Sequence, residues 1–488
     1  MGFVILGVWL ASGARIALNA GGDPNALGSF DPVNTLLQLV ILLGSTTLVM
    51  RDLPRCLLLL RPAWPFLLML AVLLASVVWS QSPMHSLRRC VSMTGLLLFV
   101  ISTYAGFGPR RSMRIILLTM LGIAALSLAE AVGRPAVGYD VGEYANAIRG
   151  VFQQKNALGM AMLAGALSLS FIVLERGFLR LRDLVILFGL LAMLVLCRST
   201  TSLLLTLFTA TCTGIILGLH KGHAWMATTL LGLGIGATTG LLFFAAVGAE
   251  GFFDLIGKDS SLTGRVYIWA AVRDVISTRP LLGHGYFAFW IDGMPGMRRI
   301  WDLVEWEVPT AHSGYLEVLL QLGALGAALG AAMLAVTLFR AIRGLFGGNA
   351  RRASWILMFL VILSILSYSE SVLFNPDMQT IFWMLGTMAL MDGGHGPAGP
   401  DVVPRAPGML FQTRMRRGSR CGTSAEGRPG RRPGPRRGGK STPGPAVSFS
   451  RASGQGLRRH RSSEGEATGF KPSETPCRQK ENRWRGLG

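Results

Sequence analysis

The sequence has few charged residues, and this sets the class of protein. Of its 488 residues only 15% are Asp, Glu, Lys or Arg, whereas 51% are hydrophobic and the mean hydropathy is +0.46. An ordinary soluble globular protein is excluded by this composition. The sequence predicts instead a chain that is largely surrounded by lipid.

Cysteine is also scarce, and no two cysteines have the spacing of a zinc site or of an extracellular disulfide framework. The six lie in or beside apolar segments, or in the C-terminal region: Cys56, Cys90, Cys197, Cys212, Cys421 and Cys477. The cysteines therefore indicate neither a zinc site nor a disulfide framework; no metal or cofactor is expected.

No basic region precedes the first apolar stretch, so a cleaved signal peptide is not expected. Apolar stretches near the ~20 residues that cross a bilayer recur along the chain. About twelve spans are expected: 3–20, 34–50, 63–80, 90–107, 115–133, 157–174, 183–197, 202–219, 225–248, 313–339, 353–373 and 376–391. We therefore predict an all-α integral membrane protein whose membrane domain covers residues 1–392.

Basic residues alternate in density between successive loops, which predicts the orientation. The dense loops are expected in the cytoplasm and contain Arg51, Arg55, Arg61, Arg110, Arg111, Arg114, Arg176, Arg180, Arg182, Lys221, Arg340, Arg343, Arg351 and Arg352. The positive-inside rule then places both termini inside and the long loop 249–312 outside, in the periplasm or exterior.

Few ionisable residues lie inside the expected spans, among them Arg15, Glu130, Glu317, Glu370 and Asp377. In the predicted topology each lies near the outward end of its helix. A set of charges at mid-membrane, typical of transport and proton pathways, is missing. This distribution favours a catalytic chamber at the outer face.

The C-terminal region 393–488 has a different composition. Residues 401–488 hold about twenty Lys and Arg against six Asp and Glu, which is most of the formal charge of +21. This Gly-, Pro-, Ser- and Arg-rich segment cannot build a core, and we expect a disordered cytoplasmic tail. Contact with anionic lipid is one interpretation. Nucleic-acid binding is disfavoured because interleaved aromatic residues are lacking, and the favoured interpretation is a tail without function.

Four outward segments supply the polar residues of a candidate site: RGVFQQKNALG, RSTTS, TGRVYIW and AHSGYLE. They contain Arg149, Lys155, Asn156, Arg198, Arg265, His312, Ser313 and Glu317. Each guanidinium group can bind two phosphate oxygens at once and stays charged at any pH. The basic residues of these segments therefore suit a diphosphate ligand. A histidine that titrates near neutrality suits a general base for an acceptor hydroxyl.

Plainer interpretations accompany each of these residues. Arg149 and Lys155 taken singly are typical of side chains that reach the membrane interface. His284, in GHG, is interpreted as a loop residue without a role. Trp269, Trp290, Trp301 and Trp306 are typical of an interfacial aromatic belt, although aromatic faces also stack on sugars.

The ordered set RGVFQQKNALG, RSTTS, TGRVYIW with RPLLGHGYFAFW, and AHSGYLE followed by LGALG resembles the O-antigen ligase/polymerase superfamily of bacterial envelope glycosyltransferases. VVWSQSPMHSLRR, from Val77 to Arg89, fits the same family, and the exopolysaccharide polymerases are the most similar branch. The resemblance covers roughly residues 30–391. One departure is Ser313, where many members have asparagine.

The resemblance implies a GT-C-like fold in the bacterial inner membrane with a periplasmic active face. It implies that Arg198 and Arg265 hold the diphosphate of a polyprenyl-linked oligosaccharide donor, supported by Arg149 and Lys155. His312 would be the catalytic base, with Asn156, Ser313 and Glu317 in supporting positions. The acceptor would be a glycan or a lipid-linked glycan, and membrane lipid and other polysaccharide-export proteins are the expected partners.

Two alternatives to polymerisation stay open at this point. A ligase that transfers glycan to lipid A–core uses the same set of residues. A polysaccharide flippase or other transporter should instead show an inverted repeat and polar or broken helices at mid-membrane, and the sequence shows neither feature.

Overall fold

The structure is a computed structural model that describes residues 1–14, 32–140, 146–222, 265–291, 293–304 and 307–392. The chain divides into two units, Met1–Arg405 and Ala406–Gly488, and all described residues belong to the first. The expected span 225–248, the first part of the long loop up to residue 264, and the predicted tail 393–488 lie outside the described residues.

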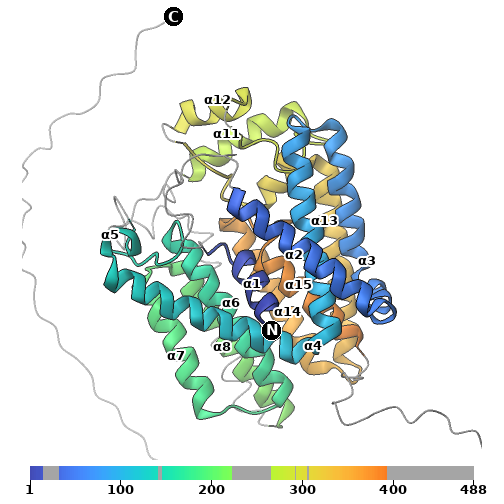
Figure 1. Cartoon of the computed structure of the whole chain (residues 1–488), viewed down its shortest axis with the longest axis vertical. Coiled ribbons are helices and arrows are strands. Elements are labelled where there is room, and N and C mark those ends of the chain that lie inside the picture. Colours follow the sequence, from blue (N-terminus) through green and yellow to red (C-terminus); the bar gives the residue numbers. More distant parts are fainter. Residues whose placement is uncertain (15–31, 141–145, 223–264, 292, 305–306, 393–488) are drawn as a thin grey trace, which may run out of the picture. The chain divides into compact units, whose positions relative to one another are not determined.

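The described part of the chain is helical, with one isolated β-bridge between Tyr139 and Ile148 and no strand. Figure 1 shows the helices in sequence colours. Their bounds are α1 Gly2–Ala11, α2 Pro32–Arg51, α3 Leu53–Ser76, η2 Val77–Trp79, α4 Pro83–Gly133, α5 Pro135–Gly138, α6 Lys155–Arg176, α7 Leu181–Leu196, α8 Thr200–His220, α11 Arg265–Thr278, α12 Pro295–Val304, α13 Gly314–Leu345, α14 Ala350–Ser369 and α15 Met378–Met391.

Seven of the described helices are long and apolar enough to cross a membrane: α2, α3 with η2, α4, α6, α8, α13 and α14. Two shorter apolar helices, α1 and α15, coincide with expected spans at the two ends of the membrane domain. The class of a multi-pass helical membrane protein is thus confirmed. The count of twelve spans, the GT-C-like arrangement and the sidedness of the loops stay predictions.

The longest helix, α4, is two helices joined at a kink. At 1.5 Å per residue its 51 residues would extend about 75 Å, more than twice the ~30 Å hydrocarbon thickness. Gly108 interrupts it with a positive φ of 67°, and Pro109 follows. The break falls between the expected spans 90–107 and 115–133, so these two spans share one continuous element.

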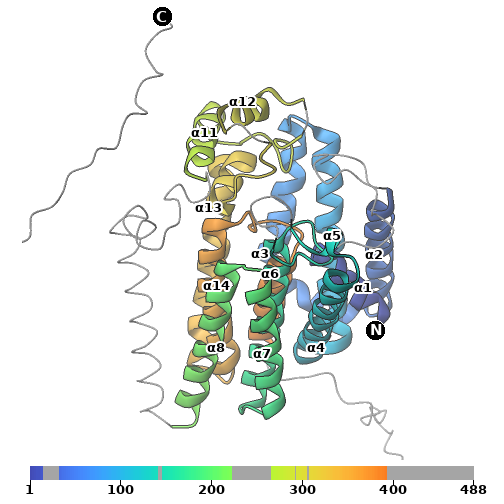
Figure 2. The ribbon, with the colours of Figure 1, turned by 90° about the vertical axis from the view of Figure 1, so that its left-hand side faces the viewer.

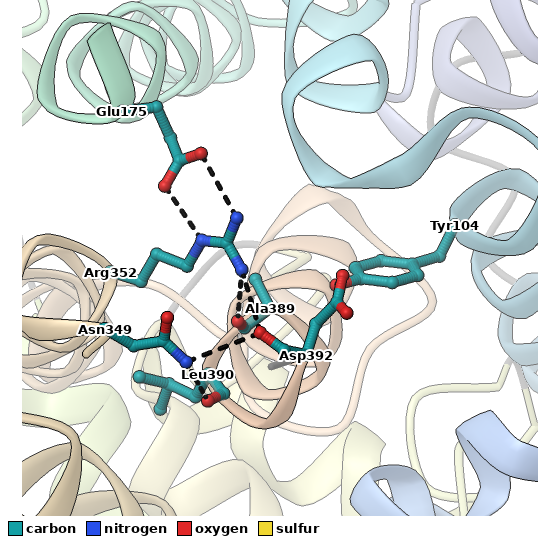
Figure 3. Close-up of polar contacts among 7 residues, drawn as sticks. All are labelled: Tyr104, Glu175, Asn349, Arg352, Ala389, Leu390 and Asp392. Carbon is teal, nitrogen blue, oxygen red and sulfur yellow. Dashed lines mark hydrogen bonds and ion pairs between the residues drawn. The ribbon is translucent and has the colours of Figure 1, made fainter. Parts of the chain in front are cut away.

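The bundle has two ends, which Figure 2 shows above and below the long helices. At one end, here called the Arg352 end, the guanidinium of Arg352 binds both carboxylate oxygens of Glu175 at 2.8 and 3.3 Å. It also donates to the carbonyls of Ala389 and Asp392, and the Tyr104 hydroxyl donates to the Asp392 carboxylate (Figure 3). These contacts join the start of α14 to the ends of α6 and α15.

Because α6 ends where α14 begins, the two helices are antiparallel, and α14 ends near the start of α6. Between their ends the Trp355 indole packs edge-on against Phe171 and donates to the carbonyl of Leu167. The start of α13 joins the end of α14, since the Tyr315 hydroxyl donates to the Ser364 carbonyl. This opposite end, called the His312 end, holds the predicted site residues.

Candidate functional site

An ion pair between distant parts of the chain lies at the His312 end. Arg265 is the first residue of α11, and its Nη2 lies 3.3 Å from Oε1 of Glu370, which follows α14. The side chains are only 20% and 16% exposed. Burial raises the pKa of Glu370, while the Arg265 charge opposes that rise. The Arg265 side chain is therefore a partly buried cation that is paired with the carboxylate of Glu370.

His312 lies beside this pair, on the loop that leads into α13. Its backbone has a positive φ of 47°, which is uncommon for a residue other than glycine. Burial, and secondly the positive charge of Arg265, lower the pKa of the imidazole from 6.5 to about 4. The ring is therefore neutral at pH 7, which is the form that accepts a proton.

Glu317, one turn into α13, holds the His312 loop in place. Its Oε2 accepts the backbone N–H of Ala311 at 2.9 Å. Its Oε1 accepts Nε1 of Trp290 at 2.8 Å and Nε2 of Gln321 at 2.7 Å. The side chain is 3% exposed, so this carboxylate is occupied by three donors and positions the backbone next to His312.

Aromatic side chains pack around the same loop. The Trp269 indole donates to the carbonyl of Ala311 at 3.1 Å and meets the Tyr368 ring edge-on at 5.2 Å. Together with Glu317, it holds both the carbonyl and the N–H of Ala311. Trp269 and Trp290 are thus part of the site's support rather than only belt residues, while Trp301 binds the carbonyl of Val308 and Trp306 lies outside the described residues.

The segment Pro280–Gly285 fits into a break in α13. Gly323 interrupts that helix with a φ of 61°, and a Cβ there would lie 2.4 Å from the backbone of Leu281. The freed backbone groups pair across the break: Ala324 and Leu325 donate to the carbonyls of residues 280 and 281, and residues 284 and 285 donate to those of residues 320 and 321. The segment that precedes α13 is therefore hydrogen-bonded to a membrane helix.

His284 lies in this docked segment and is 4% exposed. Its Nδ1 lies 2.7 Å from Nε2 of Gln81, and its ring packs 5.3 Å from that of Phe289. His284 does lie in a loop, as expected. Its side chain, however, is buried and links this loop to the one that carries Gln81.

The remaining predicted residues form a second group. The N–H of Ile148 donates to the carbonyl of Leu196, which brings the loop bearing Arg149 next to the turn bearing Arg198. That turn also packs on α6: a Cβ on Gly159 would lie 2.4 Å from Oγ of Ser199. Lys155 begins α6, and its backbone N–H donates to Asp140.

The two arginines of this second group differ in their contacts. Arg149 donates from Nε to the carbonyl of Val137 and from Nη1 to that of Gln153, so its guanidinium is already used by the loop. Arg198 has a φ of 51° and an exposed side chain, with no ion-pair partner among the described residues. Arg198 is therefore the member of this group best suited to bind an incoming anion.

The structure thus gathers Arg265, His312 and Glu317 in one group and Arg149, Lys155 and Arg198 in another, both at the His312 end. Ser313 precedes α13 and is buried, and Asn156 follows Lys155 in α6. Glu370 was not among the predicted site residues. The available signal was its place at the outward end of an apolar stretch, but nothing in the sequence pairs it with Arg265.

Residues 184–331 match the model of the O-antigen ligase family. The chain is also 27% identical over 298 residues to the exopolysaccharide production protein ExoQ of Rhizobium meliloti (strain 1021). Both matches support the resemblance of the chain to the O-antigen ligase/polymerase superfamily.

The two matches cover different parts of the chain. The alignment with ExoQ spans 58% of the chain and 66% of the relative, just under two thirds of its length. The family match includes Arg198, Arg265, His312 and Glu317, whereas Glu370 and the loop bearing Arg149 lie outside it. The chain therefore resembles this group of membrane proteins over its central part. Among the described residues, no three His, Cys, Asp or Glu side chains are grouped so that they could hold a metal ion.

Proposed function

We propose that the protein is a glycosyltransferase that joins polyprenyl-diphosphate-linked oligosaccharide units into an exopolysaccharide or O-antigen chain, without a metal or cofactor. The observation that carries this proposal is the juxtaposition of a neutral, half-buried imidazole at His312 with the partly buried Arg265 cation. The similarity to an exopolysaccharide production protein supports polymerisation.

In this mechanism His312 removes the proton from a hydroxyl of the acceptor sugar. The hydroxyl oxygen attacks the anomeric carbon of the donor, and the bond from that carbon to the diphosphate oxygen breaks. The leaving diphosphate keeps the electron pair, and fixed positive charge stabilises it as it departs. Arg265 of the first group and Arg198 of the second supply that charge, together with Lys155 and Arg149 of the second group.

The Arg265–Glu370 ion pair must open before Arg265 can bind the donor diphosphate. Without donor, one carboxylate oxygen balances the Arg265 charge at 3.3 Å. A diphosphate carries more negative charge than a carboxylate and offers oxygens for a bidentate contact. We infer that the donor displaces Glu370 from Arg265. The added negative charge beside His312 then favours its protonated form, so the imidazole becomes a stronger base when substrate is present.

A ligase that transfers glycan to lipid A–core is the second candidate, and the match of residues 184–331 to the O-antigen ligase family favours it. The two activities differ in the acceptor. Purified protein given only the polyprenyl-diphosphate oligosaccharide should form a ladder of longer chains if it is a polymerase. A ligase should form product only when a lipid A–core acceptor is added.

We further propose that the protein lies in the bacterial inner membrane with the His312 end facing the periplasm. The Arg-rich Arg352 end then faces the cytoplasm, as the positive-inside rule requires. A lipid-linked sugar donor reaches the site from the outer leaflet, and other polysaccharide-export proteins are candidate partners for the product.

The catalytic assignment is tested by His312→Ala in a deletion strain, with long-chain glycan measured at matched membrane levels. Loss of a general base typically lowers the rate by ~10²–10⁴-fold, so polymer should disappear. The control is His220→Ala, an exposed histidine at the Arg352 end, which should leave polymer unchanged. Near-normal polymer from His312→Ala would rule out the general base.

Two further variants distinguish a role in donor binding from a role in folding. Arg265→Lys should also be severe, because an ammonium keeps the charge but lacks the two-pronged contact. His284→Ala should lower the amount of folded protein, because that side chain is buried against Gln81 and Phe289. Activity per folded molecule should stay near that of the wild type.

A further inference from the structure

A basic cleft lies at the Arg352 end, away from the site described above. It has a volume of about 330 Å³ and lies between the second half of α4, the end of α6 and the start of α7. Four arginines line it, namely Arg110, Arg114, Arg176 and Arg182, together with a single acidic residue, Asp183. The cleft therefore has a net positive charge.

The charges of this cleft are only partly balanced within the protein. Arg176 is buried and paired with Asp183, and Arg182 lies 3.8 Å from the same carboxylate. Asp183 also accepts the backbone N–H of Arg180 at the start of α7. Arg110 and Arg114 have exposed side chains one helical turn apart, with no ion-pair partner among the described residues. Two adjacent guanidinium groups are thus available to an anion from outside the protein.

The rest of the cleft wall is aliphatic, and its arrangement is the same on each helix. Leu117 and Leu118 follow Arg114 by about one turn along α4, and Ile186 follows Arg182 by one turn along α7. On α6, Ile172 and Leu169 precede Arg176 by one and two turns. Every helix therefore has arginine at its end and an apolar side chain roughly 5–10 Å further into the bundle.

This order of charge and then hydrocarbon is the order of groups in a phospholipid. We propose that the cleft binds one anionic phospholipid, with its phosphate on Arg110 and Arg114 and an acyl chain along Leu118, Ile172 and Ile186. A free phosphate would use the arginines but leave the aliphatic wall unexplained, and Leu118, in an apolar helix long enough to cross a membrane, is 52% exposed. Basic pockets between membrane helices are suited to such headgroups.

The proposal does not depend on the glycosyltransferase activity. The bound lipid would join α4 to α6 and α7, and these helices lead at their other ends to the segments bearing Arg149 and Arg198. We expect the headgroup to act as a fixed part of the Arg352 end, because Asp183 alone cannot balance the arginines around it.

The test measures binding of phosphatidylglycerol to the purified full-length protein in detergent by native mass spectrometry. Each Arg near the lipid surface contributes about 1 kcal/mol, so Arg110→Gln/Arg114→Gln should weaken the apparent Kd roughly 30-fold. The matched control is Arg61→Gln/Arg111→Gln, two exposed arginines of the same end that do not line the cleft. It should bind as the wild type does.

Three results would overturn the proposal. One is equal weakening by the control, which would indicate a general surface charge effect. Another is equally tight binding of zwitterionic phosphatidylcholine, and the third is displacement of the lipid by millimolar inorganic phosphate. If the double variant does not fold, a photoactivatable phosphatidylglycerol is used with the wild type. Its cross-links should map to residues 110–118 or 169–186, and cross-links elsewhere would refute the site.

Discussion

Replacing Glu317 with glutamine keeps the size of the side chain and removes its negative charge. The carboxylate accepts three hydrogen bonds, from the Ala311 N–H, the Trp290 indole and the Gln321 amide. The glutamine oxygen can keep the two bonds made by Oε1. Its NH₂ group then points at the Ala311 N–H, so that two donors face each other. We expect the His312 loop to lose its main restraint.

The magnitude follows from the burial of this cluster. Glu317 is 3% exposed, so the Ala311 N–H has no access to water once its acceptor is gone. An unsatisfied buried donor costs about 1–3 kcal/mol, and the two remaining bonds weaken because their acceptor is no longer charged. The left-handed backbone of His312 is no longer held, and an error of about 1 Å in position can lower a rate about 100-fold.

The assay has two readouts at matched protein amounts, thermal unfolding in detergent and glycan formation. Glu317→Gln should lower the unfolding temperature and reduce activity by roughly 10- to 100-fold. Glu307→Gln is the control, since Glu307 is an exposed carboxylate on the segment that leads to α13. A Glu317→Gln protein with wild-type activity and unfolding temperature would refute the role of this carboxylate in holding the loop.

Two other predictions concern pH and the C-terminal region. Because the pKa of His312 falls from 6.5 to about 4 on folding, the unfolded state takes up more protons as pH falls through that window. The wild type should therefore lose more stability between pH 6.5 and 4 than His312→Gln does, as thermal unfolding at several pH values will show. Truncation after Asp392 should preserve insertion and glycan formation, whereas truncation after Met388 should reduce folded protein, because it removes the carbonyls bound by Arg352. Equal amounts of folded protein from both truncations would contradict the latter expectation.

Much of the helical architecture follows from local sequence. The apolar run 157–174 lies inside α6, Lys155–Arg176, because nothing in the run interrupts its hydrogen bonding and most of its side chains are buried. The boundary between the runs 90–107 and 115–133 was also visible, since Gly108 and Pro109 are poor helix formers. What was not visible is that both runs belong to one continuous element with a kink.

The site was less accessible to prediction from sequence. His312 and Glu317 are close in the chain, so one loop accounts for their proximity. The Arg265–Glu370 pair joins residues 105 positions apart, and no local pattern encodes such a contact. The apolar run 313–339 predicts an unbroken helix across Gly323, because a glycine in such a run does not reveal whether its φ is positive. The backbone groups that occupy the break come from residues 280–285.

The docking of residues 280–285 into the break of α13 has a consequence for protein engineering. Here the loop supplies hydrogen-bond partners to Ala324 and Leu325, and a membrane helix cannot leave such groups unpaired without a cost of several kcal/mol each. The smallest unit that can be transplanted is therefore the loop together with α13, and a chimera joined between them should fail at insertion rather than at catalysis.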